Sequence, residues 1–144
     1  MSKILIIPDV HGRSFWHKAE ELINEVDKVV FLGDYLDPYG HEGITFDDAL
    51  KEFEKILEFK DKYGDKVVLL VGNHDCHYIS TSFMDCSRLN YLQRQDIHEL
   101  YMKHIDKFQL VWEFDTWLFS HAGVYEGWMN LCQFTIDDVW HGEF

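Results

Sequence analysis

The amino-acid sequence predicts a single α/β domain built on a parallel β-sheet. Three short aliphatic runs, at residues 4–7, 28–32 and 66–71, have the continuous apolar character of buried strands. Two segments with apolar residues at helical spacing, 14–26 and 45–63, lie between these runs. A strand–helix–strand–helix–strand order gives parallel strands joined by right-handed crossovers. We therefore expect the 144 residues to form one domain.

The two helical segments carry signals at their ends. Ser14 is a candidate N-cap of the first helix and Thr45 of the second, because both side chains can accept a hydrogen bond from the first helical turn. Gly64 follows the second segment, in the position where glycine commonly ends a helix. These signals predict helices over 14–26 and 45–63.

The pattern is weaker after the third strand. A polar segment is followed by a predicted helix over residues 94–106. Two short apolar runs, 109–114 and 116–120, then predict a β-hairpin with its turn at 113–115. From Gly123 onward the sequence predicts helical or irregular structure.

Composition limits the possible functions and the compartment. The net charge of -13 argues against a broad basic surface for nucleic acid. The N-terminal apolar run is too short for a secretory signal, and no run approaches the roughly 20 residues that cross a bilayer. The three cysteines, an odd number without a C-x-x-C pair, fit a reducing compartment. We expect a soluble cytoplasmic protein without membrane partners.

Polar residues follow each predicted strand directly. The four segments, in chain order, are Asp9-Val10-His11-Gly12, Gly33-Asp34-Tyr35-Leu36-Asp37, Gly72-Asn73-His74-Asp75 and Ser120-His121-Ala122-Gly123. In open α/β sheets, ligands bind beyond the carboxyl ends of the strands. The sequence therefore predicts one site at that edge of the sheet.

The residue types at these strand ends favour metal ions. Asp9 and His11 are two positions apart on an extended segment, so both can face one ion. Asp34 could bridge two ions through its two oxygens. Mixed oxygen and nitrogen ligation suits Mn, Fe, Zn or Ni. Two divalent ions about 3.5–4 Å apart can clamp a phosphate group.

In their order and approximate gaps, the four segments resemble the motifs of calcineurin-like metallophosphoesterases. Residues 72–76 and 120–123 are most similar to the branch of protein serine/threonine phosphatases and bacterial diadenosine-tetraphosphate hydrolases. The resemblance covers residues 4–124. It implies two mixed β-sheets packed face to face with helices outside, a four-layer αββα fold. It also implies hydrolysis of a phosphomonoester or nucleotide-type phosphate by a hydroxide that bridges two divalent ions, Mn being favoured.

The same resemblance implies roles for single residues. His74 would be the general acid that protonates the leaving oxygen, and Asp37 would orient it. Asp75 is equally a candidate helix cap and a candidate site residue. The implied metal ligands are Asp9, His11 and Asp34 for the first ion, and Asp34, Asn73 and His121 for the second.

The phosphate-binding residue departs from the family pattern. Protein phosphatases have Arg-Gly after the motif that ends here in Asp37, and that arginine binds phosphate, whereas this chain has Pro38. Candidate substitutes and substrate contacts are Arg13, Arg88 and His41. The expected substrate is a small phosphorylated molecule, with a nucleotide and a phosphoprotein as the alternatives. Packing or surface roles are predicted for the other histidines between the motifs, which are His17, His77, His98 and His104.

The second departure concerns the C-terminal end. The family carries a further Gly-His element after the motif of His121, and the Trp-His-Gly setting of His141 does not resemble it. The sequence therefore predicts a C-terminally shortened domain with an incomplete second sheet, whose exposed edge could pair with a second copy. The alternative function is a catalytically weak metal-binding or interaction domain.

Overall fold

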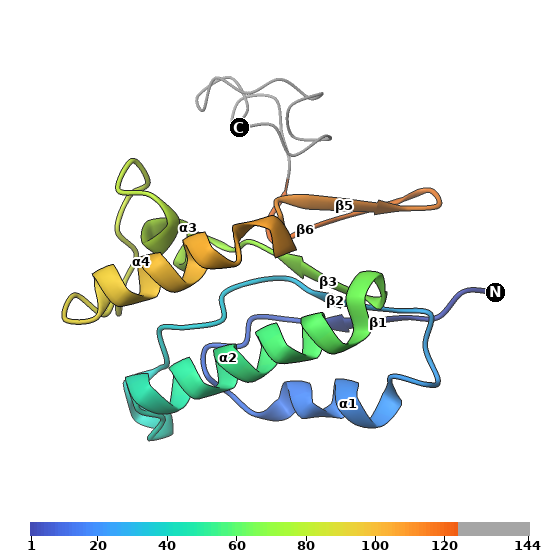
Figure 1. Cartoon of the computed structure of the whole chain (residues 1–144), viewed down its shortest axis with the longest axis horizontal. Helices are drawn as coiled ribbons and strands as arrows, with labels where there is room; N and C mark the ends of the chain where they lie inside the picture. Colours follow the sequence, from blue (N-terminus) through green and yellow to red (C-terminus); the bar gives the residue numbers. More distant parts are fainter. Residues whose placement is uncertain (124–144) are drawn as a thin grey trace.

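The computed structural model describes residues 1–123 and shows a parallel sheet with helices on one face and a hairpin on the other (Figure 1). The sheet order is β1-β2-β3-β4, and every pairing in it is parallel. The second sheet contains the antiparallel pair β5 and β6. The strands within residues 1–123 are β1 (Ile4–Ile7), β2 (Lys28–Phe31), β3 (Val67–Leu70), β4 (Phe108–Gln109), β5 (Val111–Phe114) and β6 (Trp117–Ser120). The predicted α/β fold with two sheets is confirmed.

Four α-helices accompany the strands in the described part of the chain. Helices α1 and α2 lie together on one side of the sheet, and α3 and α4 lie beside each other near the carboxyl end of β3 (Figure 1). Their bounds are α1 (Lys18–Leu22), α2 (Phe46–Tyr63), α3 (Asn73–Ile79) and α4 (Arg94–Lys103). None of the helices within residues 1–123 is both long enough and apolar enough to cross a membrane.

Strand side chains alternate between two cores. Val29, Phe31 and Leu69 face the larger core, which they share with α1, α2 and α4. Val30 and Val68 face the other way, into a smaller core completed by side chains of the β5–β6 hairpin. Because successive side chains of a strand point to opposite faces, a continuous apolar run is required when both faces are covered. The hairpin is thereby packed on the sheet face opposite α1 and α2.

The first helix is shorter than the sequence predicts. The segment begins with a 3-10 turn, Phe15–His17, and only Lys18–Leu22 is α-helical. The tight turn buries Trp16, whose indole Nε1 donates a hydrogen bond to Glu52 of α2. Ser14 occupies the N-cap position of this turn as predicted, but its side chain makes no capping hydrogen bond. After Leu22 the chain turns into β2, where the Lys3 N–H donates to the Asp27 carboxylate.

Three further boundaries differ from the predictions. The helix predicted over 94–106 ends at Lys103 and is followed by a 3-10 turn, Ile105–Lys107. The apolar run predicted as one strand is divided, because Phe108–Gln109 extends the parallel sheet as β4 and Val111–Phe114 pairs with β6. The hairpin turn lies between Phe114 and Trp117, one residue later than expected. His141 and residues 135–140 lie outside the described part of the chain.

The second helix begins as predicted. Thr45 Oγ1 accepts a hydrogen bond from the Asp48 N–H at 3.0 Å, and the Asp48 carboxylate accepts from the Thr45 N–H at 3.3 Å. This reciprocal pair is a capping box, which satisfies backbone donors that the first helical turn leaves free. Gly64 ends the helix, with its N–H donating to the Lys60 carbonyl.

We predict that Thr45→Ala lowers the free energy of unfolding by about 1 kcal/mol, because the substitution removes the capping acceptor. Urea denaturation followed by circular dichroism measures this change. Ser14→Ala is the matched control, because Ser14 makes no capping bond, and it should leave the midpoint nearly unchanged. Equal midpoints for Thr45→Ala and the wild type would contradict the assignment.

Candidate metal centre

The polar segments that follow the strands meet at the carboxyl edge of the parallel sheet. Asp34 follows β2, and the Val10 and His11 N–H groups after β1 both donate to its carbonyl, at 3.1 and 2.7 Å. Asn73 and His74 begin α3 directly after β3. His121 follows β6 and donates from Nδ1 to the Leu32 carbonyl at 2.9 Å. Segments far apart in the sequence thus deliver carboxylate, amide and imidazole groups to one place.

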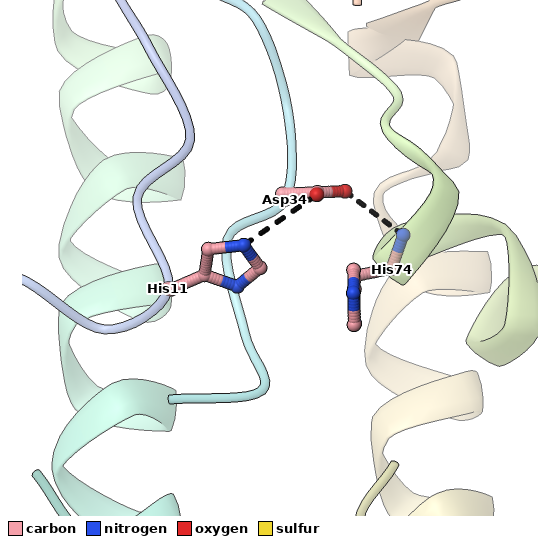
Figure 2. Close-up of side chains that lie close together, drawn as sticks. All are labelled: His11, Asp34 and His74. Atoms are coloured by element: carbon pink, nitrogen blue, oxygen red, sulfur yellow. Dashed lines mark hydrogen bonds and ion pairs between the residues drawn. The ribbon is translucent and has the colours of Figure 1, made fainter. Parts of the chain in front are cut away.

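Asp34 is the central side chain of this site. It is buried, and its Oδ1 accepts the His74 N–H at 2.8 Å (Figure 2). Its Oδ2 lies 3.6 Å from His11 Nε2 and also 3.6 Å from His121 Nε2. One carboxylate oxygen is therefore shared between histidines that arrive from the two different sheets.

In neutral rings with hydrogen on Nδ1, His11 and His121 would both present a lone pair toward Asp34. His11 Nδ1 donates to the Leu36 carbonyl at 2.7 Å, just as His121 Nδ1 donates to Leu32. A neutral ring with hydrogen on Nδ1 carries its free lone pair on Nε2. Burial lowers the pKa of His11, although the Leu36 carbonyl and the Asp34 carboxylate raise it in part. The ring is therefore neutral near pH 7, which is the form that binds metal ions.

The donor set fits divalent metal ions. Besides Asp34, His121 Nε2 faces Asn73 Oδ1 at 2.9 Å, and the Asn73 amide is oriented by its Nδ2–H, which donates to Cys86 Sγ. Lone pairs that point at one another in a partly buried site are unfavourable unless a cation or a proton lies among them. A separation of 3.6 Å between nitrogen and oxygen is also close to that of two ligands each about 2.0–2.2 Å from one ion.

The compact groups of potential ligands differ in membership from the two predicted sets. The structure brings Asp9 together with Asp34 and His121, and His11 together with Asp34 and His74, with ligand atoms within 4.8 Å in each group. Asp9 is half exposed and lies 3.8 Å from His121 Nδ1. Asp34 belongs to both groups, which is the position that the sequence suggested for a bridging carboxylate.

Left-handed backbone at three non-glycine residues shapes the site. His11, Asp34 and Asp37 have φ values of 45°, 55° and 60°. This region costs a non-glycine residue about 1–3 kcal/mol and persists only where surrounding contacts enforce it. Such conformations are concentrated at functional sites in proteins. Here they aim side chains that would otherwise follow the strand direction.

Asp75 supplies several of the contacts that hold the Asp34 backbone in this conformation. Its buried carboxylate accepts the N–H groups of Asp34 at 2.7 Å, Tyr35 at 3.1 Å and Gly72 at 2.7 Å, and also the Tyr101 hydroxyl. Burial and the nearby Asp34 charge raise the pKa of Asp75 to about 6, while its hydrogen bonds act in the opposite direction. Of the two roles open for Asp75, the structure shows the helix cap, which also holds the Asp34 backbone.

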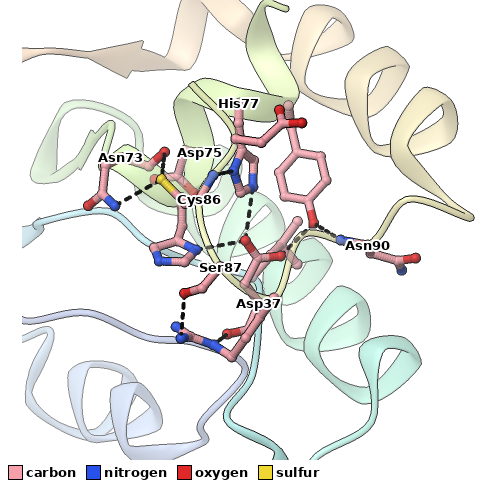
Figure 3. Close-up of polar contacts among 12 residues, drawn as sticks. Asp37, Asn73, Asp75, His77, Cys86, Ser87 and Asn90 are labelled. Atoms are coloured by element: carbon pink, nitrogen blue, oxygen red, sulfur yellow. Dashed lines mark hydrogen bonds and ion pairs between the residues drawn. The ribbon is translucent and has the colours of Figure 1, made fainter. Parts of the chain in front are cut away.

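His74 and Asp37 form a buried pair beside the candidate metal ligands. His74 Nδ1 donates to Asp37 Oδ2 at 2.8 Å. The Tyr78 hydroxyl donates to Asp37 Oδ1, and His77 Nε2 lies 2.9 Å from Oδ2 (Figure 3). Burial raises the pKa of Asp37, but the hydrogen bonds from His74 and Tyr78 and the close approach of His77 outweigh burial and leave the pKa lowered. Asp37 is therefore an ionised carboxylate at neutral pH.

His77 is the site residue that sequence reasoning missed. The sequence predicts a packing or surface role, and the ring is indeed buried, but it lies against the Asp37 carboxylate. The signal was its spacing of three from His74, which puts both rings on one side of a helix. That spacing is informative only if residues 73–79 are recognised as a helix, and the sequence predicted only a polar segment there. His17 and His98 do lie elsewhere, bound to Glu20 and Glu52 and to the Tyr78 carbonyl, respectively.

The three candidate substrate residues have different environments. Arg13 is paired with Glu42, at 3.0 Å from Nε to each carboxylate oxygen. Arg88 lies over the Tyr39 ring at 3.8 Å and donates from Nε to the Asp37 carbonyl at 3.0 Å. The buried Nη2 of Arg88 has no hydrogen-bond partner among residues 1–123. His41 is exposed beside Tyr39. Arg88 is thus the candidate with an unused donor.

Comparison with known proteins identifies the class. The two-sheet α/β fold places histidines and carboxylates, which suit divalent metal ions, together at the strand ends. The sequence profile of the calcineurin-like phosphoesterases matches residues 2–144, so the chain belongs to that family. No curated protein matches the chain.

Gly72 provides a test of the metal centre. A Cβ atom at this position would lie 2.1 Å from Asp34 Oδ1, so alanine must displace the central carboxylate. We predict that Gly72→Ala weakens Mn²⁺ binding about 10–100-fold, the usual effect of disturbing the support of a metal ligand. Isothermal titration calorimetry measures the affinity.

Gly40→Ala is the matched control, because a Cβ there meets nothing within 4 Å. It should bind Mn²⁺ like the wild type. Unchanged affinity in Gly72→Ala would show that ions bind somewhere other than Asp34.

Proposed function

We propose that the protein hydrolyses phosphomonoesters or nucleotide-type phosphates with two divalent metal ions, Mn²⁺ being favoured. Membership of the calcineurin-like phosphoesterases supports a metal-dependent hydrolase. The observation that carries the proposal is the single Asp34 oxygen placed 3.6 Å from the Nε2 atoms of both His11 and His121. A carboxylate shared in this way suits two adjacent ions.

The candidate ligands would hold the ions at the sheet edge. These ligands are Asp9, His11, Asp34, Asn73 and His121. When bound, divalent ions supply Lewis acidity toward the phosphate oxygens and toward water. The chain itself supplies the fixed directions of the ligands, because backbone carbonyls hold the Nδ1–H of both histidines.

His74 would act on the leaving group. Its Nδ1–H is engaged by Asp37, so Nε2 is the atom that can give a proton to the leaving oxygen. The ionised Asp37 accepts the Nδ1–H and so fixes the direction of the His74 ring. Proton donation prevents the accumulation of negative charge on a poor leaving group.

Arg88 would bind the phosphate in place of the arginine that protein phosphatases have after the Asp37 motif. Its guanidinium is held by Tyr39 and by the Asp37 carbonyl, which also places it beside the His74–Asp37 pair. The buried Nη2 leaves one donor for an anion. Arginine suits this task, because its planar group binds phosphate oxygens at fixed geometry. The proposed substrate is accordingly a small phosphorylated molecule.

We predict that His74→Asn lowers kcat for phenyl phosphate by roughly 10²–10⁴, because a general acid contributes that much. Steady-state assays with Mn²⁺ measure the rate. Asp34→Asn provides the background level without an intact metal site. If His74→Asn leaves the turnover of phenyl phosphate unchanged, His74 is not the general acid. Wild-type turnover no faster than Asp34→Asn would favour a metal-binding domain without catalysis.

We predict that Arg88→Ala raises KM for p-nitrophenyl phosphate roughly tenfold or more, the loss expected for a hydrogen bond to a charged group. Arg13→Ala is the comparison and should cause a smaller change, because Glu42 already neutralises Arg13. A larger increase in KM for Arg13→Ala than for Arg88→Ala would reverse the assignment of the phosphate-binding residue.

A further inference from the structure

One oxygen of Asp37 lies between two imidazole rings. His74 Nδ1 and His77 Nε2 approach Asp37 Oδ2 at 2.8 and 2.9 Å, and the two rings are 5.6 Å apart in an edge-to-face arrangement (Figure 3). Both histidines come from α3 and are separated by one helical turn. His77 is inaccessible to solvent, so it cannot be a substrate contact.

The environment of His77 determines where its proton lies. The Cys86 N–H donates to His77 Nδ1 at 3.0 Å (Figure 3). A backbone N–H can only donate, so Nδ1 accepts and a neutral His77 carries its hydrogen on Nε2. That hydrogen is on the side of Asp37. The contact between His77 Nε2 and Asp37 Oδ2 is short but poorly directed, since Nε2 makes no well-aligned hydrogen bond within the described residues. Catalytic hydrogen bonds often have this loose geometry before substrate binds.

The Asp37 carboxylate is held from both ends. Oδ1 accepts the Tyr78 hydroxyl, and that hydroxyl in turn accepts the Asn90 N–H at 2.8 Å. Oδ2 accepts His74 and faces His77. Rotation of the carboxylate would break the contacts at both oxygens together. Its orientation therefore depends on His77 as well as on Tyr78.

We propose that His77 is a positioning residue for the general acid: it fixes Asp37 Oδ2, and Asp37 in turn holds His74 with Nε2 toward the leaving oxygen. This inference rests on the proposed phosphoesterase function. His77 touches neither substrate nor metal and acts through Asp37. An alternative reading is a third metal site, because Asp37, His74 and His77 have ligand atoms within 4.8 Å of one another. The hydrogen that Cys86 fixes on His77 Nε2 opposes this reading, since a metal ligand needs a free lone pair there.

The decisive test compares leaving groups. Phenyl phosphate needs a proton on its departing oxygen, whereas p-nitrophenyl phosphate releases a stable anion. We expect His77→Leu to lower kcat for phenyl phosphate about tenfold and to affect p-nitrophenyl phosphate much less. His77→Gln retains an N–H donor near the position of Nε2 and should recover most of the lost rate. His98→Leu is the matched control, because within residues 1–123 the His98 ring bonds to a backbone carbonyl and to no side chain.

A double-mutant cycle shows whether His77 acts through His74. In the His74→Asn background, His77→Leu should cause no further loss for phenyl phosphate, because the group that it positions is already gone. Equal losses for both substrates, additive losses in the cycle, or a third bound ion in the wild type that His77→Leu removes would each overturn the proposal. Thermal melting of every variant separates these outcomes from unfolding.

Histidine NMR tests the same inference without turnover. In protein labelled with ¹⁵N-histidine, we expect His77 to carry hydrogen on Nε2 and none on Nδ1. The His74 Nδ1–H signal should shift in His77→Leu but not in His98→Leu. Hydrogen on His77 Nδ1, or an unshifted His74 signal, would overturn the positioning role. Wild-type protein that hydrolyses neither ester would instead refute the phosphoesterase proposal, while NMR still decides the role of His77.

Discussion

Two buried carboxylates, Asp34 and Asp75, support the whole site from adjacent positions. Burial first, and the Asp34 charge second, raise the pKa of Asp75, so the fold disfavours a second negative charge beside Asp34. Backbone N–H groups offset part of this cost, and one of them, from Asp34 itself, ties the two residues together. A cation bound at Asp34 would relieve the rest, which would couple metal binding to folding stability.

The fold was predictable where single segments carry their own signals. The three buried strands and the helix capped by Thr45 were recognised, because continuous apolar runs and capping residues act locally. Helix α3 was not recognised from the sequence, because Asn73-His74-Asp75 are weak helix formers and the helix depends on the Asp75 cap. Strand β4 has two residues and exists only by pairing with β3, which no local pattern reveals.

The candidate site shows the same division. Asp9, His11, Asp34, Asn73 and His121 could be proposed together because each directly follows a strand or begins the next helix. The sequence could not distinguish Arg13 from Arg88 as the candidate phosphate-binding residue. The difference depends on the pairing of Arg13 with Glu42 and on the stacking of Arg88 over Tyr39. His77 required knowledge of α3. Sequence patterns thus proposed the candidate ligands, whereas the contacts that distinguish Arg88 and His77 exist only in the folded chain.

The origin of His121 has a consequence for the order of assembly. Among the five candidate ligands, it alone comes from the β5–β6 hairpin, whose place is set by the smaller core against Val30 and Val68. A chain whose hairpin has not yet docked holds the other four ligands but lacks the imidazole that closes the set. Only a chain in which the two sheets have packed together would then be able to hydrolyse substrate. The ions would link the two sheets, because they would bind ligands from both. A partly folded chain would then also be inactive.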